Sequence, residues 1–88
     1  MKLRGDFVVR QVMDKTVAVP VGQTALRLNG MILLNDVSER IWTCLEQETD
    51  LESMVTAVTD AFDVSSDEAR TDILEFCDKL RKMQFLEE

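Results

Sequence analysis

Few residues of this chain have the chemistry needed for catalysis or metal binding. The sequence contains no histidine and no tyrosine, and its two cysteines, Cys44 and Cys77, stand far apart. Two such thiols cannot complete a structural zinc site without further cysteine or histidine ligands. The three glycines are scattered and form no phosphate-binding loop. We therefore expect no enzyme active site, no metal ion and no cofactor.

One row of side chains has the spacing of a binding surface. Arg70, Leu74, Cys77 and Arg81 recur at intervals of four, three and four, which places them on one face of a helix. The row is half apolar and has a cation at each end. Two interpretations remain open. It is either a boundary row, whose aliphatic stems lie along the edge of the core, or the wall of a groove beside a sheet.

The totals describe one small globular domain. The chain has 88 residues, of which 45% are hydrophobic, and its net charge is −7. Residues 1–34 carry five basic and two acidic side chains, whereas residues 35–88 carry five basic and fifteen acidic ones. A protein of this charge is a poor partner for nucleic acid, because nucleic-acid affinity depends on neutralising phosphates. The basic amino-terminal third would instead attract an acidic partner.

The sequence has no signal peptide and no apolar stretch long enough to span a membrane. We therefore expect a cytoplasmic protein whose two thiols are free and mostly buried.

The first third of the chain predicts a small sheet. Residues 7–13 and 16–19 are rich in β-branched types and should form a hairpin around a turn at Asp14-Lys15, ended by Pro20. A further strand is expected at 31–34. Asn29-Gly30 between apolar runs is a hairpin signal, which favours a short strand at 25–28; a plain loop over 22–29 is the alternative.

Three helices are expected after the strands, each with a start signal. Asn35 or Asp36 should cap the first, Thr49 with Glu52 the second, and Ser65 with Glu68 the third. Each helix has an apolar stripe for the core, and we expect Trp42 to be a core anchor. The third stripe consists of Ala69, Ile73, Phe76, Leu80 and Met83. Strands followed by helices indicate an α+β domain.

Several segments in this order resemble the PqqD-like family. They are 19–22 (VPVG), 30–35 (GMILLN), Ile41-Trp42, 49–55 (TDLESMV), 62–65 (FDVS), 72–76 (DILEF) and the closing Phe85-Leu86. Together they extend over about nine-tenths of the chain, and it is their order and spacing that carry the resemblance.

The resemblance implies a winged-helix-like domain, in which a small antiparallel three-stranded sheet is followed by three helices. Such domains, also called RiPP recognition elements, bind the leader segment of a precursor peptide and hold it for a modifying enzyme. That enzyme is a radical SAM protein, or the protease and cyclase of lasso-peptide synthesis. The leader adds as a strand to the open edge of the sheet. The expected leader-binding residues are Gly30, Met31, Ile32, Leu33, Leu34, Arg70, Ile73, Leu74, Cys77 and Arg81.

The chain departs from the family pattern in two places. Residues 22–29 are longer than the turn of the shortest members, and Gln84 replaces the glycine often found before the closing apolar pair, so the third helix is expected to run on. The alternative function is a winged-helix DNA-binding or regulatory module. Its reading helix, taken as 66–84, would carry a net charge of −1, which suits a polyanion poorly. A small enzyme subunit has no support in the sequence.

Overall fold

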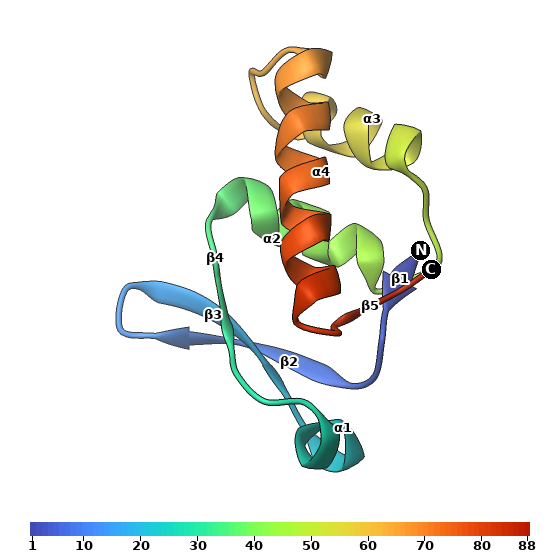
Figure 1. Cartoon of the computed structure of the whole chain (residues 1–88). Coiled ribbons are helices and arrows are strands. Elements are labelled where there is room, and N and C mark those ends of the chain that lie inside the picture. The colour runs from blue at the N-terminus through green and yellow to red at the C-terminus, as the bar shows by residue number, and fades with distance from the viewer.

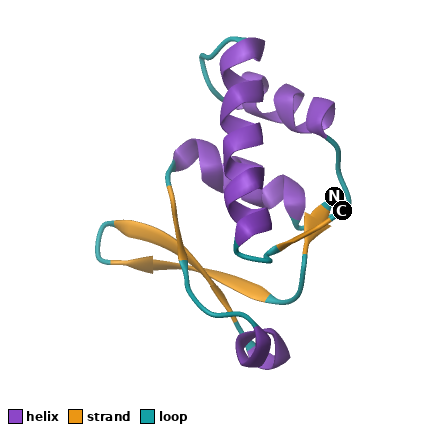
Figure 2. Cartoon of the chain, in the orientation of Figure 1, coloured by secondary structure: helices purple, strands orange, loops and turns teal.

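The computed structural model describes all 88 residues as one α+β unit (Figure 1). In chain order the elements are β1 (Lys2–Leu3), β2 (Phe7–Val12), β3 (Lys15–Pro20), α1 (Gly22–Arg27), β4 (Ile32–Leu34), α2 (Asp36–Leu45), α3 (Leu51–Ala61), α4 (Ser66–Lys82) and β5 (Leu86–Glu87). The predicted α+β class and three-stranded antiparallel sheet are confirmed, although the structure has four helices where three were expected (Figure 2).

The main sheet has the strand order β2-β3-β4, and both pairs are antiparallel. Val12 faces Lys15 across the hairpin, so the two turn residues are Met13 and Asp14, one position earlier than predicted. Met13 has a φ of 59°, a left-handed conformation of the kind that two-residue hairpins require. The geometry of the two-residue turn therefore outweighed the local preference of Asp14-Lys15 for a turn.

The long helices form a bundle on one face of this sheet, in which α2 contacts β4 and α3 packs on α2 and α4. Ala18 of β3 and Ile32 of β4 join a core of buried side chains from α2, α3 and α4. Trp42 is 1% exposed, which confirms it as a core anchor. The ring of Phe7 meets Trp42 edge-on, with 5.2 Å between the ring centroids, and its centroid lies 4.8 Å from that of Phe85. The sheet and the carboxyl end of the chain therefore share one aromatic cluster.

The helix caps agree with the sequence at two of three positions. Asn35 caps α2 in a reciprocal capping box with Ser38, and Ser65 caps α4 by accepting the Glu68 N–H. The predicted cap of α3 is wrong, because the side chain of Asp50, and not that of Thr49, accepts the N–H of Ser53 in the first turn. The backbone of Thr49 is occupied elsewhere, since its N–H donates to the Met1 carbonyl at 2.9 Å.

The short strand expected at 25–28 is replaced by helix α1 and an extended Leu28. Thr24 anchors this helix: its side chain is buried, and its hydroxyl accepts the Asp6 N–H at 2.7 Å. Gly30, with a φ of 101°, turns the chain into β4 rather than closing a hairpin. As a result no preceding strand covers β4, which pairs with β3 alone.

The expected continuation of α4 through Gln84 is also wrong. Gln84 has a φ of 63° and ends the helix as a glycine would. Its N–H donates to the Arg81 carbonyl, and the next N–H, that of Phe85, donates to the Leu80 carbonyl. These two bonds form a Schellman motif. The reversal sends Phe85 into the core and lets β5 pair with β1.

None of the helices combines the length and hydrophobicity needed to cross a lipid bilayer.

Candidate functional site

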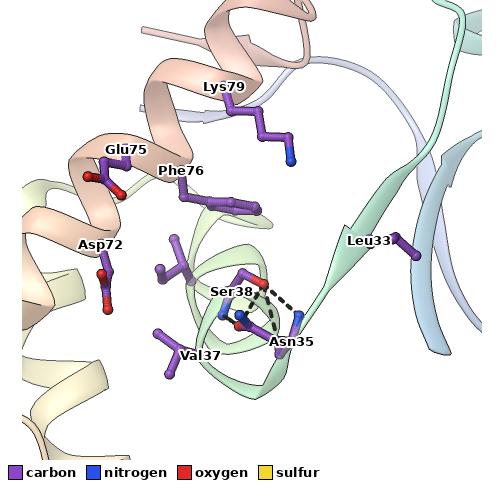
Figure 3. Close-up of a pocket in the computed structure, with 9 residues that line it drawn as sticks. Leu33, Asn35, Val37, Ser38, Asp72, Glu75, Phe76 and Lys79 are labelled. Carbon is purple, nitrogen blue, oxygen red and sulfur yellow. Dashed lines mark hydrogen bonds between the residues drawn. The ribbon is translucent and has the colours of Figure 1, made fainter. Parts of the chain in front are cut away.

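A groove of about 350 Å³ lies between β4, the start of α2 and one flank of α4 (Figure 3). Its floor is apolar, and its rim carries charges and the α2 capping box. The lining residues are Leu33, Asn35, Val37, Ser38, Ile41, Asp72, Glu75, Phe76 and Lys79. The groove therefore joins a sheet edge to a helix flank.

The hydrogen-bond pattern of the sheet identifies which main-chain groups face this groove. The Val21 N–H donates to the Asp6 carbonyl at 3.0 Å, so Val21 is directed at β2. Successive residues of a strand direct their N–H and C=O to opposite sides, and opposed residues alternate between bonded and non-bonded pairs. Counting back along β3, the bonded pairs with β4 are Ala18 with Ile32 and Thr16 with Leu34. The N–H and C=O of Leu33 therefore point to the open edge of β4.

Met31, two residues before Leu33, directs its main-chain groups to the same side and makes no backbone hydrogen bond. Asn35, two residues after Leu33, uses its N–H to donate to the Ser38 hydroxyl at 2.8 Å. The open edge thus offers the polar groups of Met31 and Leu33 and stops at the α2 cap. Unpaired strand edges of this kind accept a further strand readily.

The side chains of β4 point away from this groove or into the core. Ile32 is 2% exposed and Leu34 is 6% exposed, and both pack in the core. Met31 and Leu33 are 59% and 61% exposed. In Figure 3 the Leu33 side chain is directed away from α4. The strand therefore contributes main chain to the groove, and selective side-chain contacts must come from the helices.

The helix wall of the groove consists of Asp72, Glu75, Phe76 and Lys79. Phe76 extends over the floor of the groove, and Lys79 extends toward β4 (Figure 3). The three charged side chains are exposed, and none of them takes part in an ion pair within the protein. These charges are free to meet a ligand.

The structure does not bring the predicted row of Arg70, Leu74, Cys77 and Arg81 to this groove. At about 100° per residue the row lies on the opposite flank of the α4 core stripe from Asp72, Glu75 and Lys79. Its side chains have other contacts. Arg70 pairs with Glu52 of α3 at 2.9 Å, and Arg81 pairs with Glu88 at 2.7 Å.

The remaining members of the predicted set are scattered. Ile73 is fully buried in the core, and Leu74 is exposed on the far flank. Gly30 lies at the end of the groove edge, where an added Cβ would be 3.6 Å from the Met83 side chain. The Cys77 thiol lies 3.9 Å from the Met1 sulfur, and its burial raises its pKa. Cys44 and Cys77 are both free, as expected.

The Arg81 side chain of the predicted row is held by an ion pair within the protein. The hydrogen bond between Arg81 and Glu88 raises the pKa of Arg81 and lowers the pKa of Glu88, so both side chains stay charged and paired. Sequence reasoning missed the other flank, Asp72, Glu75 and Lys79, although its spacing of three and four was equally visible. A helical repeat identifies the flanks of a stripe, but only the packing against β4 decides which flank faces the sheet.

The outer face of the sheet is apolar and uncovered by the long helices. The register places Val8, Val12, Val17, Val19, Met31 and Leu33 on this face, together with the cations Arg10 and Lys15. Val17 is buried but lies outside the main core cluster, as expected for the opposite face. This surface remains accessible when the groove is filled, because the groove lies beyond the edge of β4.

Comparisons with known proteins identify a family and a similar fold. The chain matches a family model described as "Coenzyme PQQ synthesis protein D (PqqD)" over residues 15–86. Among solved structures it is similar to "TbiB1 in Complex with the TbiA(beta) Leader Peptide", with a TM-score of 0.74 and 24% identity over 99% of this chain and 95% of that one. No curated protein matches it significantly.

Proposed function

Because the chain belongs to the PqqD family, we propose that it binds the leader segment of a ribosomally synthesised precursor peptide and presents it to a modifying enzyme. The observation that carries this proposal is the unpaired main chain of Leu33 beside a groove with an apolar floor. The similar TbiB1 structure, described as a complex with a leader peptide, supports the same assignment.

The leader is proposed to bind as a fourth strand on β4. Its main chain exchanges hydrogen bonds with Leu33 and Met31, which supplies affinity that is independent of sequence. Its inward side chains meet Phe76, Val37 and Ile41, which supplies selectivity. A short edge with few main-chain bonds suits a transient complex, from which the peptide must later be released.

The modifying enzyme is proposed to dock on the outer face of the sheet. That face is apolar and carries Arg10 and Lys15, in a protein whose remaining surface is strongly acidic. Exposed apolar surface of this kind marks interaction sites, and the cations favour an acidic partner. The family resemblance implies that this modifying enzyme is a radical SAM protein, or the protease and cyclase of lasso-peptide synthesis.

The test of peptide binding is a titration followed by backbone NMR. The probe is the leader of a short precursor gene encoded beside this chain. Saturable shifts of Met31, Leu33 and α4 positions 72–79 are expected. Shifts confined to the flank of Arg70 and Arg81 would move the site to the other side of α4. If no precursor peptide encoded beside this chain binds, the proposed function is refuted.

The test of enzyme docking separates it from peptide binding. Val12→Glu with Arg10→Glu places two acidic groups on the outer face, well away from the groove. The double variant should bind the leader with unchanged affinity but support slower modification of the precursor by the neighbouring enzyme. An unchanged modification rate would place enzyme docking on another surface.

A further inference from the structure

The charges of the groove have a fixed order along α4. Asp72 and Glu75 lie toward the amino-terminal end of the helix, Phe76 follows, and Lys79 lies one turn further on. None of the three charged groups is neutralised by another side chain of the protein. A bound ligand therefore meets negative charge at one end of the groove and positive charge at the other.

The direction of a bound strand relative to this order follows from the fold. Gly30, just before β4, lies beside Met83 at the carboxyl end of α4, whereas Asn35, just after β4, lines the groove with Asp72. Thus β4 and α4 run in opposite directions along the groove (Figure 1). The sheet is antiparallel throughout, and antiparallel pairing is the more stable arrangement per residue. An added antiparallel strand passes Asp72 first and Lys79 last.

The spacing of the ligand charges follows from helix and strand geometry. Asp72 and Lys79 are separated by about 10 Å along the helix, at about 1.5 Å per residue. A strand covers this distance in about three residues, at about 3.3 Å each. Only alternate strand residues face α4, so the nearest matching positions are i, i+2 and i+4, with side-chain reach accounting for the remainder.

We propose, building on the proposed function, that the groove selects an extended peptide with a basic residue at i, an apolar residue at i+2 and an acidic residue at i+4. The basic residue meets Asp72 and Glu75, the apolar residue covers Phe76, and the acidic residue meets Lys79. The net charge of −10 over residues 35–88 strengthens the preference for the cation.

The experiment compares three synthetic peptides on one neutral ten-residue background. They carry Lys-x-Leu-x-Glu, the reversed Glu-x-Leu-x-Lys and the uncharged Gln-x-Leu-x-Gln, and anisotropy titrations at low salt give each Kd. Because two exposed ion pairs are exchanged for two repulsions, the first peptide should bind about tenfold more tightly than the second. The Glu75→Lys/Lys79→Glu variant should lose or reverse this preference.

The matched control is the exchange Glu52→Arg/Arg70→Glu. It also keeps the net charge, and it reverses an ion pair on the far flank of α4. This control should retain the wild-type preference. Circular dichroism should find both variants folded, since the exchanged side chains lie at the surface.

Two results would overturn the charge order while leaving peptide binding in place. The first is equal affinity for the three peptides, with binding still weakened by Leu33→Pro. The second is a wild-type preference for the reversed peptide, which would indicate a parallel strand. Failure of all three peptides and of a selected random ten-residue library to bind would overturn both this inference and the proposed function.

Discussion

Proline substitutions along the sheet separate the open edge from the paired one. Leu33→Pro removes the N–H that points to the open edge, while the two bonded pairs of β4 with β3 are retained. The Leu33 side chain is 61% exposed, so its loss should cost under about 1 kcal/mol of stability. Leu33→Pro should therefore fold normally.

The same substitution should damage peptide binding strongly. One main-chain hydrogen bond contributes about 0.5–1.5 kcal/mol, and the peptide carbonyl left unpaired adds a desolvation cost of about 1–3 kcal/mol. The sum, about 1.5–4.5 kcal/mol, raises the Kd by at least about tenfold. Isothermal titration with the leader peptide measures this change directly.

Two further prolines serve as controls. Ile32→Pro removes a donor to β3 and a side chain that is 2% exposed, so it should unfold the domain and not merely release the peptide. Val9→Pro removes an outward N–H from β2, the opposite edge of the same sheet, and should leave affinity unchanged. Equal effects of Leu33→Pro and Val9→Pro on affinity, or no effect of Leu33→Pro, would refute strand addition at β4.

Four further outcomes are expected. Gln84→Gly should raise the stability by about 0.5–1 kcal/mol in urea unfolding, because residue 84 is left-handed; a decrease would contradict that geometry. Ser65→Ala should cost about 1 kcal/mol through loss of the α4 cap, with the peptide Kd unchanged, since the cap is remote from the groove. Leu74→Asp should leave both folding and the Kd nearly unchanged, and a large rise in Kd would restore the far flank as the groove wall. The pKa of Glu88 is lowered in the folded state by its pairing with Arg81. This pairing therefore stabilises the β5 end at pH values above the ordinary glutamate pKa, and the stabilisation is lost as the pH falls through the pKa of the folded state. Hydrogen exchange in β5 should then increase, and Glu88→Gln should abolish this pH dependence.

Much of the fold could be predicted because the relevant forces are local. The α4 stripe from Ala69 to Leu80 repeats at helical intervals and is buried as predicted, and the caps at Asn35 and Ser65 act on neighbouring N–H groups. The errors at 25–28 and Gln84 have a different origin. In both, a tertiary contact, the anchoring of Thr24 or the burial of Phe85, outweighed a local preference.

The same distinction between local forces and tertiary contacts applies to the site. The amino-acid sequence alone predicts that a short strand precedes a capped helix, that Trp42 belongs to the core, and that the core stripe of the long helix has a flank on each side. The packing of the folded chain sets which flank faces the open edge and which β4 residue directs its main chain there. Helical and strand repeats are periodic along one element and carry no information about the neighbour. The direction of Leu33 and the choice of Lys79 over Arg81 depend on the register with β3 and on the packing of α4, which exist only in the folded chain.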